Sequence, residues 1–154
     1  MSTTTNDHEL TIERVINAPR AVVWHAWTDP KHAAQWWGPA GCTTQAFESD
    51  LRPGGRLHIE LAFGEIVGVI ETVYEEVVEF ERVITVGSLL RDGVRLFDTR
   101  RIVTFEEIGG KTKIIVQQSF YNIDELGSES AAGAKEGLKQ QFDRLEEYLQ
   151  RTPS

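Results

Sequence analysis

The chain has 154 residues, 40% of them hydrophobic and 26% charged, and its formal net charge is −8. This length and composition indicate one globular domain with a sizeable core, and the acidic balance argues against nucleic-acid binding, which needs a concentrated basic surface. The nearest approach to a basic cluster, at Arg95, Arg100 and Arg101, is interrupted by Asp98.

Single residue types exclude further classes of protein. Cys42 is the only cysteine, so no intrachain disulfide can form, and the four scattered histidines lack the tight spacing of a metal site. We therefore expect no metal and no cofactor. Because residues 1–7 do not resemble a signal peptide and no apolar run approaches the ~20 residues of a membrane span, we expect a cytoplasmic protein. One domain is predicted at 8–151, with flexible tails at 1–7 and 152–154.

The chain begins with a predicted strand and two short helices. Apolar and polar residues alternate over 9–17, which is typical of a strand. Pro19 suits the first turn of a helix, which is predicted over 20–28. Asp29 is a suitable N-cap for a second short helix, which carries two tryptophans and ends before Pro39.

From Gly41 onward the pattern changes to strands. Turn residues such as the Gly-Gly pairs at 54–55 and 109–110 separate segments of alternating or β-branched residues. Six further strands are predicted, at 43–51, 56–63, 66–74, 81–89, 96–106 and 111–121. Seven strands joined mostly by short turns predict an antiparallel meander.

The last predicted element is a helix about five turns long, with Ser128 or Ser130 as its N-cap. Its apolar face consists of Ala134, Leu138, Phe142, Leu145 and Leu149. The first half of this helix is rich in alanine and glycine, whereas the bulky residues come later. A helix that is thin at one end would leave space above the sheet; the alternative is close backbone packing against a strand.

The order of elements predicts the fold class. A large sheet with one apolar face needs a cover, and the final helix is the one long helix available. We therefore predict an α+β fold, in which a seven-stranded curved antiparallel sheet surrounds a long C-terminal helix, with two short helices between the first and second strands.

Motifs along nearly the whole chain resemble the family of activator of heat-shock protein 90 ATPase homologues. This family belongs to the superfamily that also holds START lipid-transfer domains and the birch-pollen allergen. The motifs, in order, are Arg14 with Asn17-Ala18-Pro19, Val23-Trp24, Ala26-Trp27-Thr28-Asp29-Pro30, Trp36-Trp37-Gly38-Pro39, Asp50 with Arg52-Pro53-Gly54-Gly55-Arg56, Glu81-Arg82, and Gly137 with Asp143-Arg144-Leu145. One departure is Phe80, where the family usually has proline before Glu81-Arg82.

The resemblance implies a helix-grip architecture with an internal cavity between sheet and helix, and it does not imply one activity. Eukaryotic relatives bind the chaperone, more distant ones bind lipids or aromatic compounds, and some cyclise polyketides. Three hypotheses follow: a domain that binds a small hydrophobic or aromatic molecule, a partner-binding module for a chaperone, and an enzyme of the cyclase or dehydratase type.

Candidate residues of the cavity wall follow from strand alternation and from the small residues of the final helix, and a slip of one residue would invert the strand assignments. They are Arg14, Trp24, Trp37, Leu57, Ile59, Val103, Phe105, Ile114, Val116, Ala134 and Leu138. For the tryptophans the alternative is a role in the core. For Arg14, which could pair with a ligand carboxylate, the alternative is a bulge that turns it outward.

No catalytic residue is predicted with a complete set of partners. His58 and Glu60 share a strand face and could act as a base and its orienting group, although such a face is more often solvated. The enzyme hypothesis would place these two residues, or Arg14, in the cavity. Cys42 has no base near it in sequence and is interpreted as a packing residue.

Overall fold

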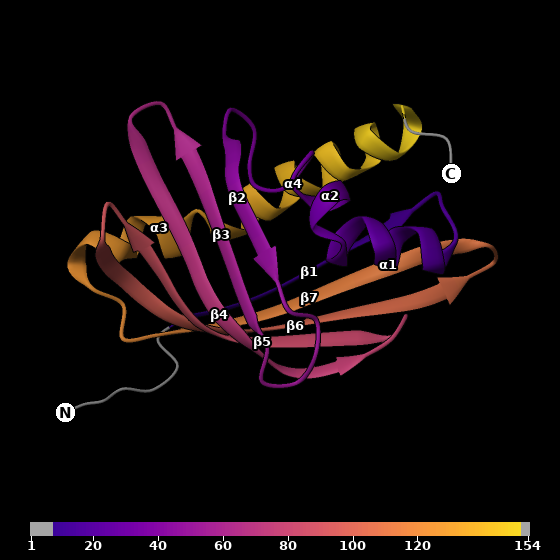
Figure 1. Ribbon diagram of the computed structural model, residues 1–154, viewed down its shortest axis with the longest axis horizontal. Helices are drawn as coiled ribbons and strands as arrows, with labels where there is room; N and C mark the ends of the chain where they lie inside the picture. Colours follow the sequence, from indigo (N-terminus) through magenta and orange to yellow (C-terminus); the bar gives the residue numbers. More distant parts are fainter. Residues whose placement is uncertain (1–7, 152–154) are drawn as a thin grey trace.

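The computed structural model describes residues 8–151, and in it a curved seven-stranded antiparallel sheet surrounds a long C-terminal helix (Figure 1). The elements are β1 (His8–Ile16), α1 (Arg20–Thr28), α2 (Pro30–Ala33), β2 (Thr43–Ser49), β3 (Arg56–Phe63), β4 (Ile66–Val78), β5 (Arg82–Arg91), β6 (Val94–Ile108), β7 (Lys111–Tyr121), the 3-10 turn η1 (Glu125–Gly127), α3 (Ser128–Ala132) and α4 (Ala134–Arg151). The predicted α+β fold class is confirmed. The predicted tails at 1–7 and 152–154 lie outside the described residues.

The sheet is a meander with one long-range closure. Its strand order is β1-β7-β6-β5-β4-β3-β2, so each strand after β2 pairs with its neighbour in sequence. The exception is β1, which pairs with β7 and places Leu10 opposite Gln118 and Ile12 opposite Val116. This pairing brings the start of the described chain beside its last strand.

The helices that precede β2 begin as their sequence predicts. The first helix covers Arg20–Thr28, the predicted range. Asp29 is the N-cap of α2, and its carboxylate accepts a hydrogen bond from the backbone N–H of Lys31 at 3.0 Å. The prediction that the second helix carries both tryptophans is wrong, because α2 ends at Ala33 and the buried Trp36 and Trp37 follow it outside the helix.

The start of the final helix differs from the prediction. Ser128 is the first residue of α3, the N-cap position belongs to Gly127, and the Ser128 hydroxyl donates to the carbonyl of Glu125 at 3.0 Å. Ser130 lies inside α3. The predicted serine cap is therefore wrong. The helix is also interrupted at Gly133, where the weak helix propensity of glycine favours a break between α3 and α4.

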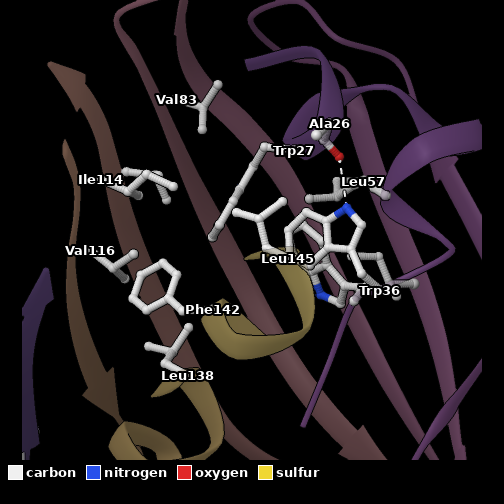
Figure 2. Packing of buried hydrophobic residues seen from close by; sticks show 14 of the residues in the cluster. Ala26, Trp27, Trp36, Leu57, Val83, Ile114, Val116, Leu138, Phe142 and Leu145 are labelled. Atoms are coloured by element: carbon white, nitrogen blue, oxygen red, sulfur yellow. Dashed lines mark hydrogen bonds between the residues drawn. The ribbon is translucent and has the colours of Figure 1, made fainter. Parts of the chain in front are cut away.

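The core fills the concave side of the sheet beneath α1 and the second half of α4. Phe142 and Leu145 of α4 point toward the strands, where Phe142 lies near Ile114 and Val116 (Figure 2). Trp27 has its ring centroid 6.2 Å from that of Phe142 and contacts the rings of further aromatic residues. All four tryptophans are buried, so each has a role in the core.

Candidate functional site

A hollow of about 400 Å³ lies between the concave face of the sheet and the first half of α4. Strands β3 to β7 supply its floor, and the segment Trp37–Pro39 supplies part of its rim. Its walls are largely apolar, with Leu57, Ile59 and Leu61 of β3 among them.

The hollow exists because the side chains at the beginning of α4 are small. Gly133, Ala134 and Gly137 line it, and the bulky Phe142 comes later in the helix. A Cβ added at Gly137 would meet only the Cβ of Pro39, at 3.9 Å, which is an ordinary contact. Close packing against a strand is therefore not the reason for glycine at position 137.

Several residues predicted for a cavity wall do line this hollow. They are Trp37, Leu57, Ile59, Val103, Ala134 and Leu138. Most of them are nearly or fully buried. That a ligand touches them stays a prediction.

Four other predicted residues, Trp24, Phe105, Ile114 and Val116, are buried in the core outside the hollow. Trp24 packs edge-on against Phe105, with ring centroids 5.3 Å apart. Ile114 and Val116 lie near Phe142 (Figure 2). Alternation assigned Phe105, Ile114 and Val116 to the correct face of the sheet, but side chains of α1, Trp24 among them, and of the second half of α4 fill the space above them.

Arg14 lies on the inner face of β1, as alternation predicts, but it does not reach the hollow. Its Nη1 lies 2.9 Å from Asp143 Oδ1 and 3.1 Å from Glu146 Oε1 on α4. Its guanidinium carbon is 5.4 Å from the ring centre of Phe142. The charge of Arg14 is thus already paired within the protein, with two carboxylates of α4.

His58 and Glu60 lie on the outer face of the sheet. Since Leu57, Ile59 and Leu61 line the hollow, the period of two turns the residues between them away from it. His58 Nε2 is 2.8 Å from Glu60 Oε2, and its Nδ1 contacts Glu71. The residues named for the enzyme hypothesis therefore do not line the hollow.

Sequence reasoning missed a polar cluster inside the hollow. Arg101 Nε and Nη2 donate to Gln118 Oε1 at 3.1 and 2.9 Å, and Gln118 Nε2 donates to Thr99 Oγ1 at 2.8 Å. All three residues line the hollow. The signal was present, because Val103 and Val116 had been assigned to the inner face and a step of two residues leads to Arg101 and Gln118.

The rim segment Trp37–Pro39 is held against α4 by two polar side chains. Arg144 Nη1 lies 2.9, 3.1 and 2.9 Å from the carbonyl oxygens of Trp37, Gly38 and Pro39. Gln141 Oε1 accepts a hydrogen bond from Gly38 N at 3.2 Å. The same Arg144 nitrogen is 3.3 Å from Cys42 Sγ, and Cys42 is buried, which agrees with its interpretation as a packing residue.

Residues 8–151 contain neither a metal-binding cluster nor a helix that could span a membrane. No group of three or more histidine, cysteine or acidic residues in this range is arranged to hold a metal ion. None of the helices in this range is both long enough and apolar enough to cross a membrane.

Comparisons with known proteins give a family and a fold. Residues 17–150 match the family model described as Activator of Hsp90 ATPase homolog 1-like protein. An uncharacterized protein from Rhizobium leguminosarum is 26% identical, with a TM-score of 0.79, and the match covers 97% of this chain and 99% of that one. CV1439 from Chromobacterium violaceum is 25% identical, with a TM-score of 0.74, and the match covers 90% of this chain and 95% of that one. Mll3558 from Rhizobium loti is 20% identical, with a TM-score of 0.80, and the match covers 96% of this chain and 99% of that one. Among curated proteins, the sequence finds no match.

Proposed function

Because the chain belongs to the family of Activator of Hsp90 ATPase homolog 1-like proteins, we propose that it is a START-like domain that binds a small, largely apolar molecule in the hollow beneath α4. The observation that carries this proposal is the hollow itself. Its volume of about 400 Å³ falls within the ~300–1,000 Å³ of small-molecule sites, and its lining is mainly apolar.

The expected affinity follows from the area that a ligand would bury. Apolar surface removed from water contributes ~25 cal/mol per Å². A modest hydrophobe enclosed by Leu57, Ile59, Val103 and Leu138 would therefore bind at roughly micromolar strength.

A neutral fluorescent hydrophobe, N-phenyl-1-naphthylamine, tests the proposal. We expect saturable binding with one site per chain and a rise in fluorescence. Ala134→Phe puts a ring into the hollow and should abolish binding, because Ala134 lines it. Ala132→Phe makes the same change at an exposed position of α3 and should leave binding intact. Absence of binding to the unmodified protein, or equal loss in both variants, would refute the proposal.

A second candidate function is that of a chaperone cofactor. The observation that favours it is the family description, which names activation of the Hsp90 ATPase. The test is the steady-state ATPase rate of Hsp90 with increasing amounts of the purified chain. Stimulation that saturates would support this function, and a flat response at saturating concentration would dismiss it.

A further inference from the structure

An arginine that has no acidic partner among residues 8–151 lies in the wall of the hollow. Arg101 projects from β6 onto the concave face, and it lines the hollow together with Thr99 and Val103. Within the described range, the interactions of its guanidinium that the structure shows are with Gln118 and include no carboxylate. Burial lowers the pKa of Arg101 to about 10, so the side chain stays charged at neutral pH.

Three other arginines of the same sheet have the opposite arrangement. Arg56 pairs with Glu71, Arg82 with Glu76, and Arg100, next to Arg101 in sequence, pairs with Glu75 at 2.8 Å. These exposed charges are solvated and gain little from their partners, whereas a buried charge is costly unless it is paired. Among the described residues, the half-buried Arg101 thus lacks a carboxylate partner although its side chain lines the hollow.

The neighbours of Arg101 hold its guanidinium in place without using all its donors. Thr99 Oγ1 donates to the carbonyl of Ser119 at 2.9 Å and accepts from Gln118 Nε2 at 2.8 Å. This series of hydrogen bonds orients Gln118 so that its Oε1 accepts from the Nε and Nη2 atoms of Arg101. A guanidinium carries five N–H groups, so the edge formed by Nη1 and Nη2 keeps donors that Gln118 does not use. That edge matches the two oxygens of a carboxylate.

A second unused donor belongs to Gln141, a residue that also lines the hollow. Gln141 is 5% exposed, and its Oε1 accepts from Gly38 N at 3.2 Å. Its Nε2 is buried and has no hydrogen-bond partner among the described residues. A buried donor without an acceptor costs about 1–3 kcal/mol, so native structures seldom keep one without a reason.

We infer that the ligand is a monocarboxylic acid with an apolar body, whose carboxylate binds Arg101 and whose polar atoms accept from Gln141 Nε2. This inference rests on the proposed function of the hollow and names the class of its ligand. One buried positive charge balances one carboxylate, whereas a phosphate dianion would leave a buried negative charge unpaired. Arg91 also lines the hollow, but at the end of β5, next to the turn.

Two probes of matched length separate the charge from the apolar body. Decanoate and decanol are each used to displace N-phenyl-1-naphthylamine at pH 8, where decanoate is ionised. A charge-assisted hydrogen bond contributes about 1.5–3 kcal/mol, so we expect decanoate to bind roughly tenfold or more tightly than decanol.

Variants test whether the preference for decanoate over decanol depends on Arg101. Arg101→Gln should weaken decanoate about tenfold and leave decanol and the fluorescent probe unchanged. Arg100→Gln removes the same charge from the neighbouring residue, which pairs with Glu75, and should change none of the three. Gln141→Glu keeps an acceptor for Gly38 N and replaces the donor by an oxygen, so it should also weaken decanoate selectively.

The outcomes distinguish this inference from the proposed function. If the unmodified protein binds the fluorescent probe but binds decanol as tightly as decanoate, the hollow is a ligand site and the inference is wrong. An acid preference that survives in Arg101→Gln contradicts it as well. If Arg101→Gln does not fold, the ratio of decanoate affinity to decanol affinity in Gln141→Glu decides instead. If neither the probe nor either ligand binds, the proposed function fails first.

Discussion

At the scale of single residues, the outer face of the sheet carries a cluster of ionised groups around His58. Glu60 lies on the same strand, and Glu48 on β2 and Glu71 on β4 lie opposite His58 in register. Hydrogen bonds with Glu60 and then Glu71 raise the pKa of His58 above 6.5. The pKa of Glu71 falls from 4.5 to about 2, chiefly through its hydrogen bond with Arg56.

This cluster predicts how stability changes with pH. A histidine with a raised pKa in the folded state contributes stability that is complete below pH 6.5 and is lost as the pH rises through the raised value. The melting temperature should therefore fall on the alkaline side of 6.5, and His58→Gln should reduce that fall. Melting curves between pH 5.5 and 9 provide the measurement. His25→Gln, at an exposed position of α1, is the control, and an equal effect of both variants would contradict the prediction.

Arg144 offers a second prediction at this scale. Arg144→Met leaves the carbonyls of Trp37, Gly38 and Pro39 without their donor. Loss of hydrogen bonds to part-buried groups should lower the free energy of unfolding by about 1–3 kcal/mol in urea denaturation. Lys139→Met removes a charge from an exposed position of α4, and its effect should stay within about 0.5 kcal/mol. Similar losses in the two variants would show that the rim segment does not depend on Arg144.

At the scale of elements, two glycines with different surroundings predict opposite effects. A Cβ at Gly87 of β5 would lie 2.2 Å from the Glu71 carbonyl oxygen and 2.6 Å from Thr72 Cα, so Gly87→Ala should destabilise the sheet by about 1–3 kcal/mol. Gly137 has room for a methyl group, and Gly137→Ala should stabilise α4 by about 0.5–1 kcal/mol. Urea denaturation of both variants is the measurement. Destabilisation by Gly137→Ala would show that the helix needs the glycine.

How well each element could be predicted depended on whether its pattern was unbroken. The ranges 20–28, 56–63 and 111–121 agree with the structure because their periodicity runs to both ends. The strand predicted to end at Tyr74 continues to Val78, because a bulge between Tyr74 and Glu76 interrupts the period of two. A second shift at Leu89 and Leu90 likewise hides the end of β5 and the start of β6.

The sequence predicted which side chains lie on the concave face of the sheet, but not which of them border the hollow. Alternation gives the face of the sheet on which a side chain lies, so Val103 and Phe105 were both correctly assigned to the concave face. It does not give the position along the groove at which a second element fills the space. That position depends on where Trp24 and Phe142 arrive, which is a matter of the tertiary fold.

At the scale of the molecule, one core connects the sheet with the helices on its concave side (Figure 1). We therefore propose that residues 8–151 unfold as one cooperative unit. The four tryptophans, buried at positions 24 to 37, report the region of α1 and α2 by fluorescence, whereas far-UV circular dichroism reports mainly the sheet. The two midpoints in urea should coincide. Separate transitions would mean that the helices after β1 form a unit of their own.

Gln141 connects the hollow with the backbone of the rim segment Trp37–Pro39. Its amide is one rigid plane, with Oε1 bonded to the backbone of Gly38 and Nε2 buried without a partner among the described residues. A guest that draws the nitrogen must tilt the oxygen too, and Gly38 is two residues from the exposed Ala40. We therefore propose that a ligand contacting this amide would also shift the backbone around Gly38, and so reach the protein surface from the hollow.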